Sequence, residues 1–182
     1  MRTRFVFVQH AQEACKPTNS ARLVCRILES ASIVPWERKA PPRLPDDAIL
    51  LYPFADAPPL SPADLDPGAT IVVPDGTWNQ TSKIANALGR FSYRRRSLNC
   101  APETAWRVRQ AGVSDRASSA QAVAMVLRLC GADDAAASLL SAHEEAGRRI
   151  LSMRGIAPPT PCCHDPNKVA TCPAGEIAPA GI

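Results

Sequence analysis

The chain has 182 residues, of which 46% are hydrophobic, and a formal net charge of +4 at neutral pH. One packed core is feasible at this size and composition, so folding requires neither a disulfide scaffold nor a structural metal. No apolar stretch approaches the roughly 18 to 20 residues of a membrane-spanning helix. The N-terminus lacks the pattern of an export signal, so we expect a cytoplasmic protein whose cysteines are reduced. The mild basicity permits a polyanionic partner without indicating one.

Short apolar runs rich in β-forming residues alternate with helical patterns along the chain. We expect strands at residues 5–8, 32–36, 48–51, 70–73, 93–98 and 105–110. The third and fourth of these runs are each expected to end at a proline. Helical spacing predicts helices at residues 21–29, 80–88, 118–130 and 133–151. This alternation predicts a single α/β domain with a mainly parallel sheet.

Three local signals mark helix ends. Gly89 suits a helix C-terminus, because glycine accepts backbone conformations that end a helix. Ser118 and Gln121 match a capping box at the start of the third helix. Asp133 is expected to cap the fourth helix, in which His143 falls on the apolar stripe and is interpreted as a packing residue.

The last part of the chain differs from the rest in composition. Prolines concentrate in residues 158–179, so we assign residues 1–157 to the domain and 158–182 to a disordered tail. The tail holds four residue types that ligate metals: Cys162, Cys163, His164 and Cys172. Their spacing matches no usual zinc pattern and adjacent cysteines chelate one ion awkwardly, so we expect no metal, with a zinc site as the alternative.

Residues 71–80 form the most informative stretch. A buried strand runs into a loop that contains Asp75, Gly76 and Trp78, and a helix follows. In open parallel sheets, ligands bind at the carboxyl ends of strands, so this loop is a natural binding site. A plain turn with Trp78 as a core anchor is the alternative.

The same loop resembles the Asp-x-Thr-Trp signature of the DTW-domain family, which comprises tRNA-uridine aminocarboxypropyltransferases related to the SPOUT methyltransferases. Further segments resemble family elements in the right order, over about residues 4–151: residues 8–10 with 16–23, 50–53, 106–109 and 118–123. Three features depart from the family pattern. Gln121 replaces an acidic residue, Phe54 replaces a small one, and an opening cysteine cluster found in many relatives is missing.

The resemblance implies a SPOUT-like fold with a C-terminal trefoil knot. It also implies that the protein transfers the 3-amino-3-carboxypropyl group of S-adenosylmethionine to N3 of a tRNA uridine and releases methylthioadenosine. Ribosomal RNA as the substrate, a SPOUT-type RNA methyltransferase and a non-catalytic RNA-binding protein stay open as alternatives. The sequence determines neither the modified uridine nor the oligomeric state.

The expected cofactor pocket is built from the loops that follow the central strands. Asp75 is the candidate general base for the N3 proton, and an Asx-type turn is its alternative. Trp78 could enclose the adenosine or the target base. Ser118 and Ser119 could hold the methionine carboxylate at a helix N-terminus, with simple capping as the alternative. The full set of expected cofactor-binding residues is Leu51, Tyr52, Pro53, Asp75, Thr77, Trp78, Ser118, Ser119 and Gln121.

Basic residues define the expected RNA-binding surface. A solvated charged face is the alternative for such runs. Strand alternation sends Arg94 and Arg96 to one side and Arg95 to the other, so the three cannot share one surface. The expected RNA-binding residues are His10, Lys16, Asn19, Arg22, Arg94, Arg96, Arg107 and Arg109.

Overall fold

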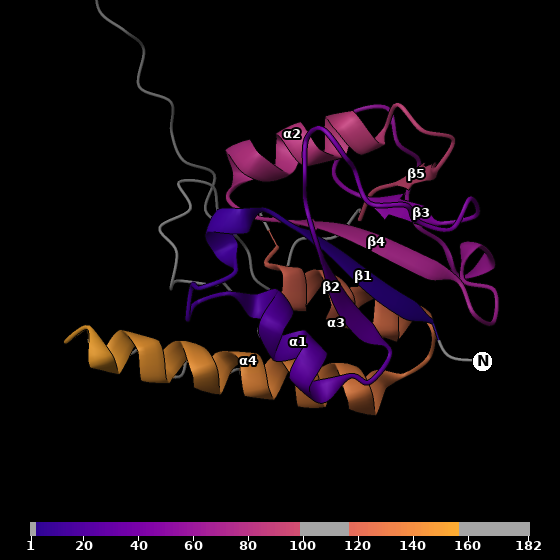
Figure 1. The fold of residues 1–182 in the computed structure, drawn as a ribbon. Helices are drawn as coiled ribbons and strands as arrows, with labels where there is room; N and C mark the ends of the chain where they lie inside the picture. The colour runs from indigo at the N-terminus through magenta and orange to yellow at the C-terminus, as the bar shows by residue number, and fades with distance from the viewer. Residues whose placement is uncertain (1–2, 99–116, 157–182) are drawn as a thin grey trace, which may run out of the picture.

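The computed structural model describes residues 3–98 and 117–156, which form an α/β domain (Figure 1). Its sheet has five strands: β1 (Arg4–Gln9), β2 (Ala31–Pro35), β3 (Ile49–Leu51), β4 (Thr70–Asp75) and β5 (Arg94–Arg96). Every pairing among them is parallel. The expected single α/β domain with a parallel sheet is therefore confirmed for the part of the chain that the structure describes.

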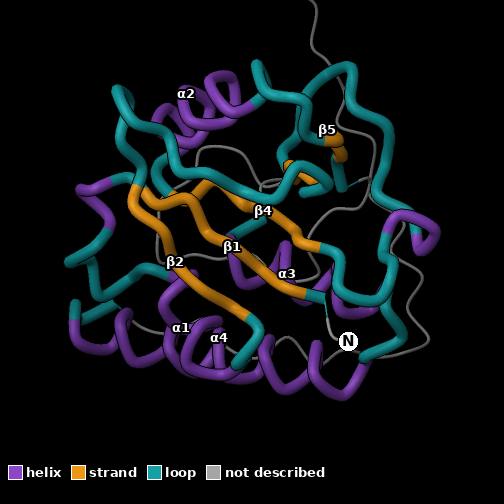
Figure 2. Tube along the Cα trace, turned by 45° about the vertical axis from the view of Figure 1, so that its right-hand side comes forward, coloured by secondary structure: helices purple, strands orange, loops and turns teal. Residues whose placement is uncertain are grey.

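Helices cover both faces of the sheet, as Figures 1 and 2 show. One face carries α2 (Trp78–Leu88), and the other carries α1 (Ser20–Ile27), α3 (Ser119–Leu129) and α4 (Asp133–Met153). Alternate strand residues supply the two cores. Phe5, Phe7 and Ile71 pack with α1, α3 and α4, whereas Val8 and Val72 pack with α2. The period-two alternation of a strand thus gives an apolar side chain to each layer.

The strand order β2-β1-β4-β3-β5 places β1 beside β4 at the centre of the sheet. The chain leaves β1 into α1 on one face, and it leaves β4 into α2 on the other face. Two neighbouring parallel strands whose connections diverge in this way open a crevice at their carboxyl ends, which is where ligands bind in such sheets. The register pairs Gln9 with Asp75 at this end.

Several predicted boundaries differ from the structure. β4 does not end at the proline but continues through Pro74 to Asp75, pairing along β1. The β3 ladder on the other side of β4 stops at Val72, so the missing N–H of Pro74 interrupts no pairing with β3. The strand expected at residues 93–98 shortens to β5. The strand expected at 105–110 and the tail lie outside the described residues, and the knot stays a prediction.

Two of the three predicted helix-end signals are confirmed. Gly89 is the C-terminal cap of α2, and Ser118 with Gln121 forms the expected capping box of α3. The prediction for Asp133 is wrong. It lies in the first turn of α4, the cap position is Ala132, and no side chain caps it. An acidic residue in the first turn still complements the helix dipole, which accounts for the misleading signal.

Candidate functional site

The carboxylate of Asp75 is the centre of a buried polar cluster at the carboxyl ends of β1 and β4. Its Oδ2 accepts hydrogen bonds from Gln9 Nε2 at 2.9 Å and from Asn19 Nδ2 at 2.6 Å. Its Oδ1 accepts from the Ser119 hydroxyl at 2.8 Å. Asp75 is only 3% exposed, so these donors replace the water that a carboxylate otherwise requires.

Local structure aims each donor at Asp75. Gln9 is the last residue of β1, one ladder step from the carboxylate. Asn19 is the N-cap of α1, and its Oδ1 accepts from the Arg22 amide at 2.9 Å, which leaves its Nδ2 free to face Asp75. Ser119 begins α3. One carboxylate, at the end of β4, therefore joins the end of β1 and the starts of α1 and α3.

Aromatic rings follow the carboxyl ends of β3 and β4. The Tyr52 ring is 6.4 Å from Trp78 and 5.0 Å from Phe54, measured between centroids. Tyr52 and Trp78 are both partly exposed. Leu51 is buried in the core, and Pro53 is exposed at the turn between the rings. The rings leave an apolar surface that a flat heterocycle could contact.

The loop between β4 and α2 is held in a tight form. The Thr77 hydroxyl accepts from the Gln80 amide, and Gln80 Oε1 accepts from the Thr77 amide at 2.8 Å, a reciprocal capping box. A Cβ built on Gly76 would lie 3.0 Å from both Cβ and Oε1 of Gln80, so a larger residue would push the box apart. The Gly76-Thr77 pair thus sets how α2 follows Asp75.

The start of α3 is bound on its other side by α4. The Ser118 hydroxyl lies 3.1 Å from His143 Nε2 and accepts from the Gln121 amide at 3.2 Å. Its own hydrogen is therefore available for donation to the unprotonated Nε2 of a neutral imidazole. His143 is 1% exposed, and burial lowers its pKa to about 4. The packing interpretation of His143 is confirmed, with the addition of a hydrogen bond to Ser118.

The expected RNA-binding arginines of β5 are engaged with carboxylates. Arg96 Nη2 lies 2.6 Å from Asp64 Oδ1, Arg94 Nη1 lies 3.9 Å from the same atom, and Arg95 pairs with Asp56 at 2.9 Å. The hydrogen bond from Arg96 holds the pKa of Asp64 well below its usual range. The side chains of β5 alternate as expected, since Arg94 and Arg96 both reach Asp64 and Arg95 reaches Asp56. The RNA-binding roles of Arg94 and Arg96 stay predictions.

The remaining expected RNA-binding residues divide between two places. Lys16 pairs with the buried Glu13 at 2.7 Å, and Arg22 donates to the Ala14 carbonyl at 3.2 Å. His10 caps the short 3-10 helix at Ala11–Glu13, its Nδ1 accepting from the Gln12 amide at 3.3 Å. His10 and Lys16 lie on the segment between β1 and α1, and Arg22 lies in the first turn of α1. The other two, Arg107 and Arg109, lie outside the described residues.

Sequence reasoning missed Gln9. Gln9 belongs to the segment 8–10 that resembles the family, but the sequence predicts no role for it. Nothing in the sequence indicates that its side-chain amide faces the carboxylate of Asp75, 66 residues away. The signal was a polar side chain directly after a buried strand, at the end of the sheet where ligands bind. The side-chain amide of Asn19 donates to Asp75, and its expected contact with RNA stays a prediction.

The described residues contain neither a membrane-spanning helix nor a cluster of metal ligands. No helix among them is long and apolar enough to cross a membrane. Nor do three or more His, Cys, Asp or Glu side chains gather there in a group that could hold a metal ion. The cysteines and the histidine of the tail lie outside this part of the chain.

In this parallel α/β sheet, a polar cluster and partly exposed rings lie at the carboxyl ends of the central strands, which is where ligands bind in open α/β domains. A model of the DTW domain matches residues 1–151, so the chain belongs to the DTW domain family. A comparison with curated proteins gave no match.

One solved structure with a similar fold is described as that of the SAM-dependent rRNA:acp-transferase Tsr3 from Vulcanisaeta distributa. The TM-score is 0.59 and the sequence identity is 24%, over 84% of this chain and 79% of that chain. At this identity the likeness establishes a common fold.

Replacing Arg96 by alanine should destabilise the domain, because Asp64, only 7% exposed, would lose its shortest ion pair. We expect a loss of roughly 1 to 3 kcal/mol in the free energy of unfolding, measured by urea denaturation. Arg95→Ala is the matched control, since its partner Asp56 is largely exposed and such pairs contribute at most about 1 kcal/mol. Equal losses for the two variants would contradict a structural role specific to Arg96.

His143 should make stability depend on pH. Its pKa of about 4 lies below the roughly 6.5 of an unfolded histidine, so the unfolded chain binds more protons between these values. The contribution is complete above about pH 6.5 and is lost as pH falls towards 4, amounting to about 3 kcal/mol. His143→Gln keeps an acceptor for Ser118 and does not titrate, so the difference in unfolding free energy between wild type and variant should follow this curve. A difference that stays constant with pH would show that His143 does not titrate as described.

Proposed function

We propose that the protein is an S-adenosylmethionine-dependent aminocarboxypropyltransferase that modifies N3 of a uridine in tRNA. The observation that carries the proposal is the position of the DTW motif. Its Asp75 lies at the carboxyl ends of β1 and β4, bonded to the end of β1 and the starts of α1 and α3, and the rings of Trp78 and Tyr52 follow the ends of β4 and β3. This is the end of the sheet where a ligand of this fold class binds.

The residues at the crevice fit S-adenosylmethionine in chemical character. The rings of Tyr52 and Trp78 offer an apolar surface to the adenine. The N-terminus of α3, with the hydroxyls of Ser118 and Ser119, suits a carboxylate, because the first amides of a helix and its dipole favour negative charge. Together with Leu51, Pro53, Thr77 and Gln121, these are the residues that we propose hold the cofactor.

The reaction requires positioning and the removal of one proton. The C–S bond at the γ-carbon of the methionine chain breaks, an N3–C bond forms, and methylthioadenosine leaves with the electron pair of the broken bond. The N3 proton of uridine is released, so the positive charge of the sulfonium ends on that proton. Selection of the γ-carbon over the methyl carbon is a matter of orientation within the pocket.

Asp75 is the residue that we propose accepts this proton. Its Oδ2 already accepts from two amide donors, whereas its Oδ1 accepts only from the Ser119 hydroxyl among the contacts of the described residues. A carboxylate oxygen accommodates two acceptor contacts, so Oδ1 is the atom with room for the uridine. The Gln9 and Asn19 amides would then fix the carboxylate while Oδ1 works as the base.

Ribosomal RNA is the second candidate substrate, and one observation favours it. The solved structure with the similar fold is described as an rRNA acp-transferase. The two substrates require the same pocket chemistry and differ only in how RNA is bound outside it. A SPOUT-type methyltransferase would release S-adenosylhomocysteine instead of methylthioadenosine.

Nucleoside analysis by mass spectrometry separates these reactions. Purified protein is incubated with S-adenosylmethionine and either unmodified tRNA or ribosomal subunits, and the digested nucleosides and small products are measured. We expect 3-(3-amino-3-carboxypropyl)uridine in the tRNA and an equal amount of methylthioadenosine. The same nucleoside in rRNA alone would transfer the proposal to that substrate. Folded protein that gives no product and binds no cofactor by calorimetry would contradict the enzyme proposal.

The variant Asp75→Asn tests the base directly. Its Oδ1 can face Gln9 and Asn19 while its Nδ2 donates to the Ser119 hydroxyl, so the cluster can survive with one bond reversed. The amide cannot accept the N3 proton, and single-turnover rates should fall by roughly 10² to 10⁴-fold. Cofactor affinity should stay within about tenfold, or roughly 1.4 kcal/mol.

The control for this experiment is Ser119→Ala, which removes one donor but leaves the carboxylate in place. Its rate should fall less than that of Asp75→Asn. Near-normal turnover of Asp75→Asn would show that the carboxylate only shapes the loop. Complete loss of cofactor binding in Asp75→Asn would show that Asp75 organises the pocket and that the proton leaves by another route.

A further inference from the structure

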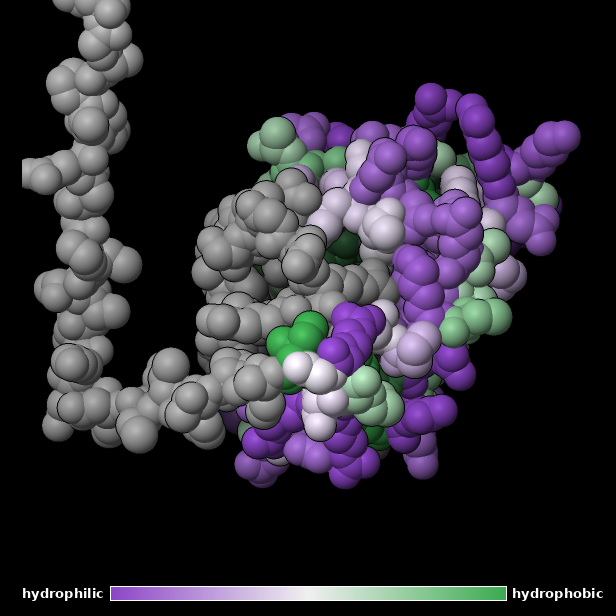
Figure 3. Space-filling model, turned by 90° about the vertical axis from the view of Figure 1, so that its left-hand side faces the viewer, coloured by the Kyte–Doolittle hydropathy of each residue, from purple (hydrophilic) through white to green (hydrophobic). Residues whose placement is uncertain are grey.

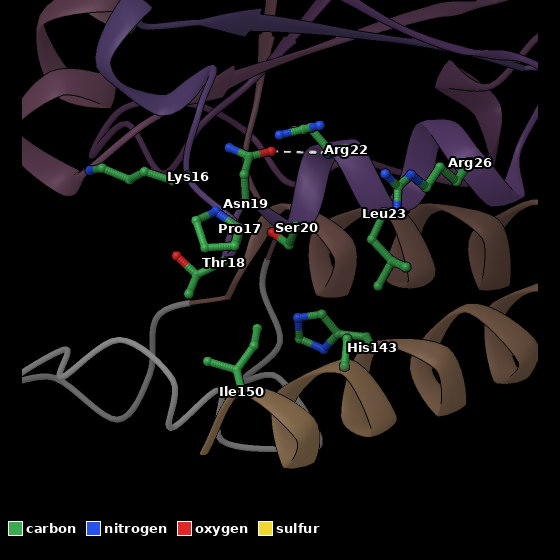
Figure 4. Close-up of a pocket in the computed structure, with 11 residues that line it drawn as sticks. Lys16, Pro17, Thr18, Asn19, Ser20, Arg22, Leu23, Arg26, His143 and Ile150 are labelled. Carbon is green, nitrogen blue, oxygen red and sulfur yellow. Dashed lines mark hydrogen bonds between the residues drawn. The ribbon is translucent and has the colours of Figure 1, made fainter. Parts of the chain in front are cut away.

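A pocket of about 310 Å³ lies behind the Asp75 cluster, between the 16–19 segment, α1 and the second half of α4 (Figure 4). It is separate from the aromatic rings of the proposed cofactor site, since none of them lines it. Figure 3 shows the face that lies on the left in Figure 1. Hydrophilic residues cover most of the described surface there, with small hydrophobic patches among them. Neither the cofactor nor the chemistry proposed above uses this pocket.

The lining of the pocket is cationic at its rim. Lys16, Arg22 and Arg26 line it, and no carboxylate does. Lys16 is partly neutralised by Glu13, whereas the one side-chain bond of Arg22 within residues 3–98 and 117–156 goes to the Ala14 carbonyl oxygen. Arg26 is exposed, and its side chain makes no hydrogen bond or ion pair within the described part of the chain. His143 is neutral near pH 7 because its pKa is about 4. The pocket therefore carries a net positive charge.

The remainder of the lining is largely apolar. Leu23 from α1 faces Ile150 and His143 from α4 across the cavity in Figure 4, and Ala146 lies between the two α4 residues in sequence. The volume is at the lower end of the roughly 300 to 1,000 Å³ typical of small-molecule pockets. A cavity with apolar walls and guanidinium groups at its rim suits a compact ligand with one flat, weakly polar part and one anionic part.

The pocket is adjacent to the proposed reaction centre. Asn19 lines it and also donates to Asp75 Oδ2 at 2.6 Å. His143 lines it and also contacts Ser118 at 3.1 Å. A ligand in the pocket is thus separated from the Asp75 cluster by the thickness of one side chain. At this spacing, two neighbouring nucleotides of one RNA strand could lie in the pocket and at the Asp75 cluster.

We infer that this pocket binds one nucleotide of the RNA substrate, next to the uridine that is modified. Its phosphate contacts Arg22 and Arg26, and its base lies against Leu23, Ala146 and Ile150. The inference rests on the proposed function for the identity of the RNA. The cofactor is a poor alternative occupant, because the sulfonium and ammonium of S-adenosylmethionine outweigh its one carboxylate, and a cationic rim repels a ligand of net positive charge.

Two variants test the charge and the shape of the pocket separately. Arg26→Ala removes a cation that makes no hydrogen bond or ion pair with the described residues. Ala146→Leu fills the cavity without a change in charge. Binding of an unmodified tRNA transcript is measured by fluorescence anisotropy between 50 and 200 mM salt. For Arg26→Ala we expect weaker binding and a salt slope that is smaller by about 0.7 to 0.9, which corresponds to one lost phosphate contact. Ala146→Leu should weaken binding even at the highest salt, because its effect is steric.

The matched control is Arg4→Ala, which removes the same charge at the amino end of β1, the opposite end of the sheet. It should leave both affinity and slope nearly unchanged. Cofactor affinity, measured by calorimetry, should be unchanged in all three variants. RNA binding by Arg26→Ala and Ala146→Leu that equals that of Arg4→Ala would overturn the inference, and so would a loss of cofactor binding in either pocket variant.

These readouts are independent of turnover. Wild-type protein that transfers the group to RNA while the pocket variants bind RNA normally would overturn the inference and leave the proposed function intact. Wild-type protein that binds RNA through the pocket but transfers nothing and binds no cofactor would overturn the proposed function alone.

Discussion

A buried carboxylate that must be given hydrogen-bond donors is the constraint on which this site depends. Asp75 is 3% exposed, and an ionised carboxylate taken from water without donors would cost several kcal/mol. Gln9, Asn19 and Ser119 supply those donors from three different elements. The need to satisfy one charge therefore fixes how the end of β1, the start of α1 and the start of α3 lie relative to β4.

This arrangement connects the parts of the site that perform different tasks. Asn19 joins Asp75 to the wall of the cationic pocket, where the proposed RNA contacts lie. Ser119 joins it to the helix start where the proposed cofactor contacts lie, and Ser118 joins that start to His143 on α4. The arginines fall into two groups, those paired with carboxylates and those that line the pocket. Those of β5 neutralise Asp56 and Asp64, whereas Arg22 and Arg26 face the pocket and have no carboxylate partner among the residues that the structure describes.

Features that depend on neighbours in sequence could be predicted. The alternation that gives Phe7 to one core and Val8 to the other is visible in the sequence as an apolar run of strand length. The capping box at Ser118 and the helix end at Gly89 are patterns within four residues. Asp75 is predicted from its place after an apolar run together with the resemblance of residues 75–78 to the Asp-x-Thr-Trp signature. The errors were also local: Pro74 was expected to end a strand that the pairing with β1 continues, and Asp133 was expected to cap a helix that Ala132 begins.

Only the tertiary structure decides the contacts between residues that are distant in sequence. Gln9 and Asn19 reach Asp75 across 66 and 56 positions, and Arg96 reaches Asp64 across 32. No periodicity encodes such pairs, because they follow from the order of strands in the sheet and the faces on which the helices pack. The sequence by itself determined the elements, the motif and its chemical type. The folded chain determined which side chains meet, because a hydrogen bond depends on positions fixed within a few tenths of an ångström by packing that no short segment contains.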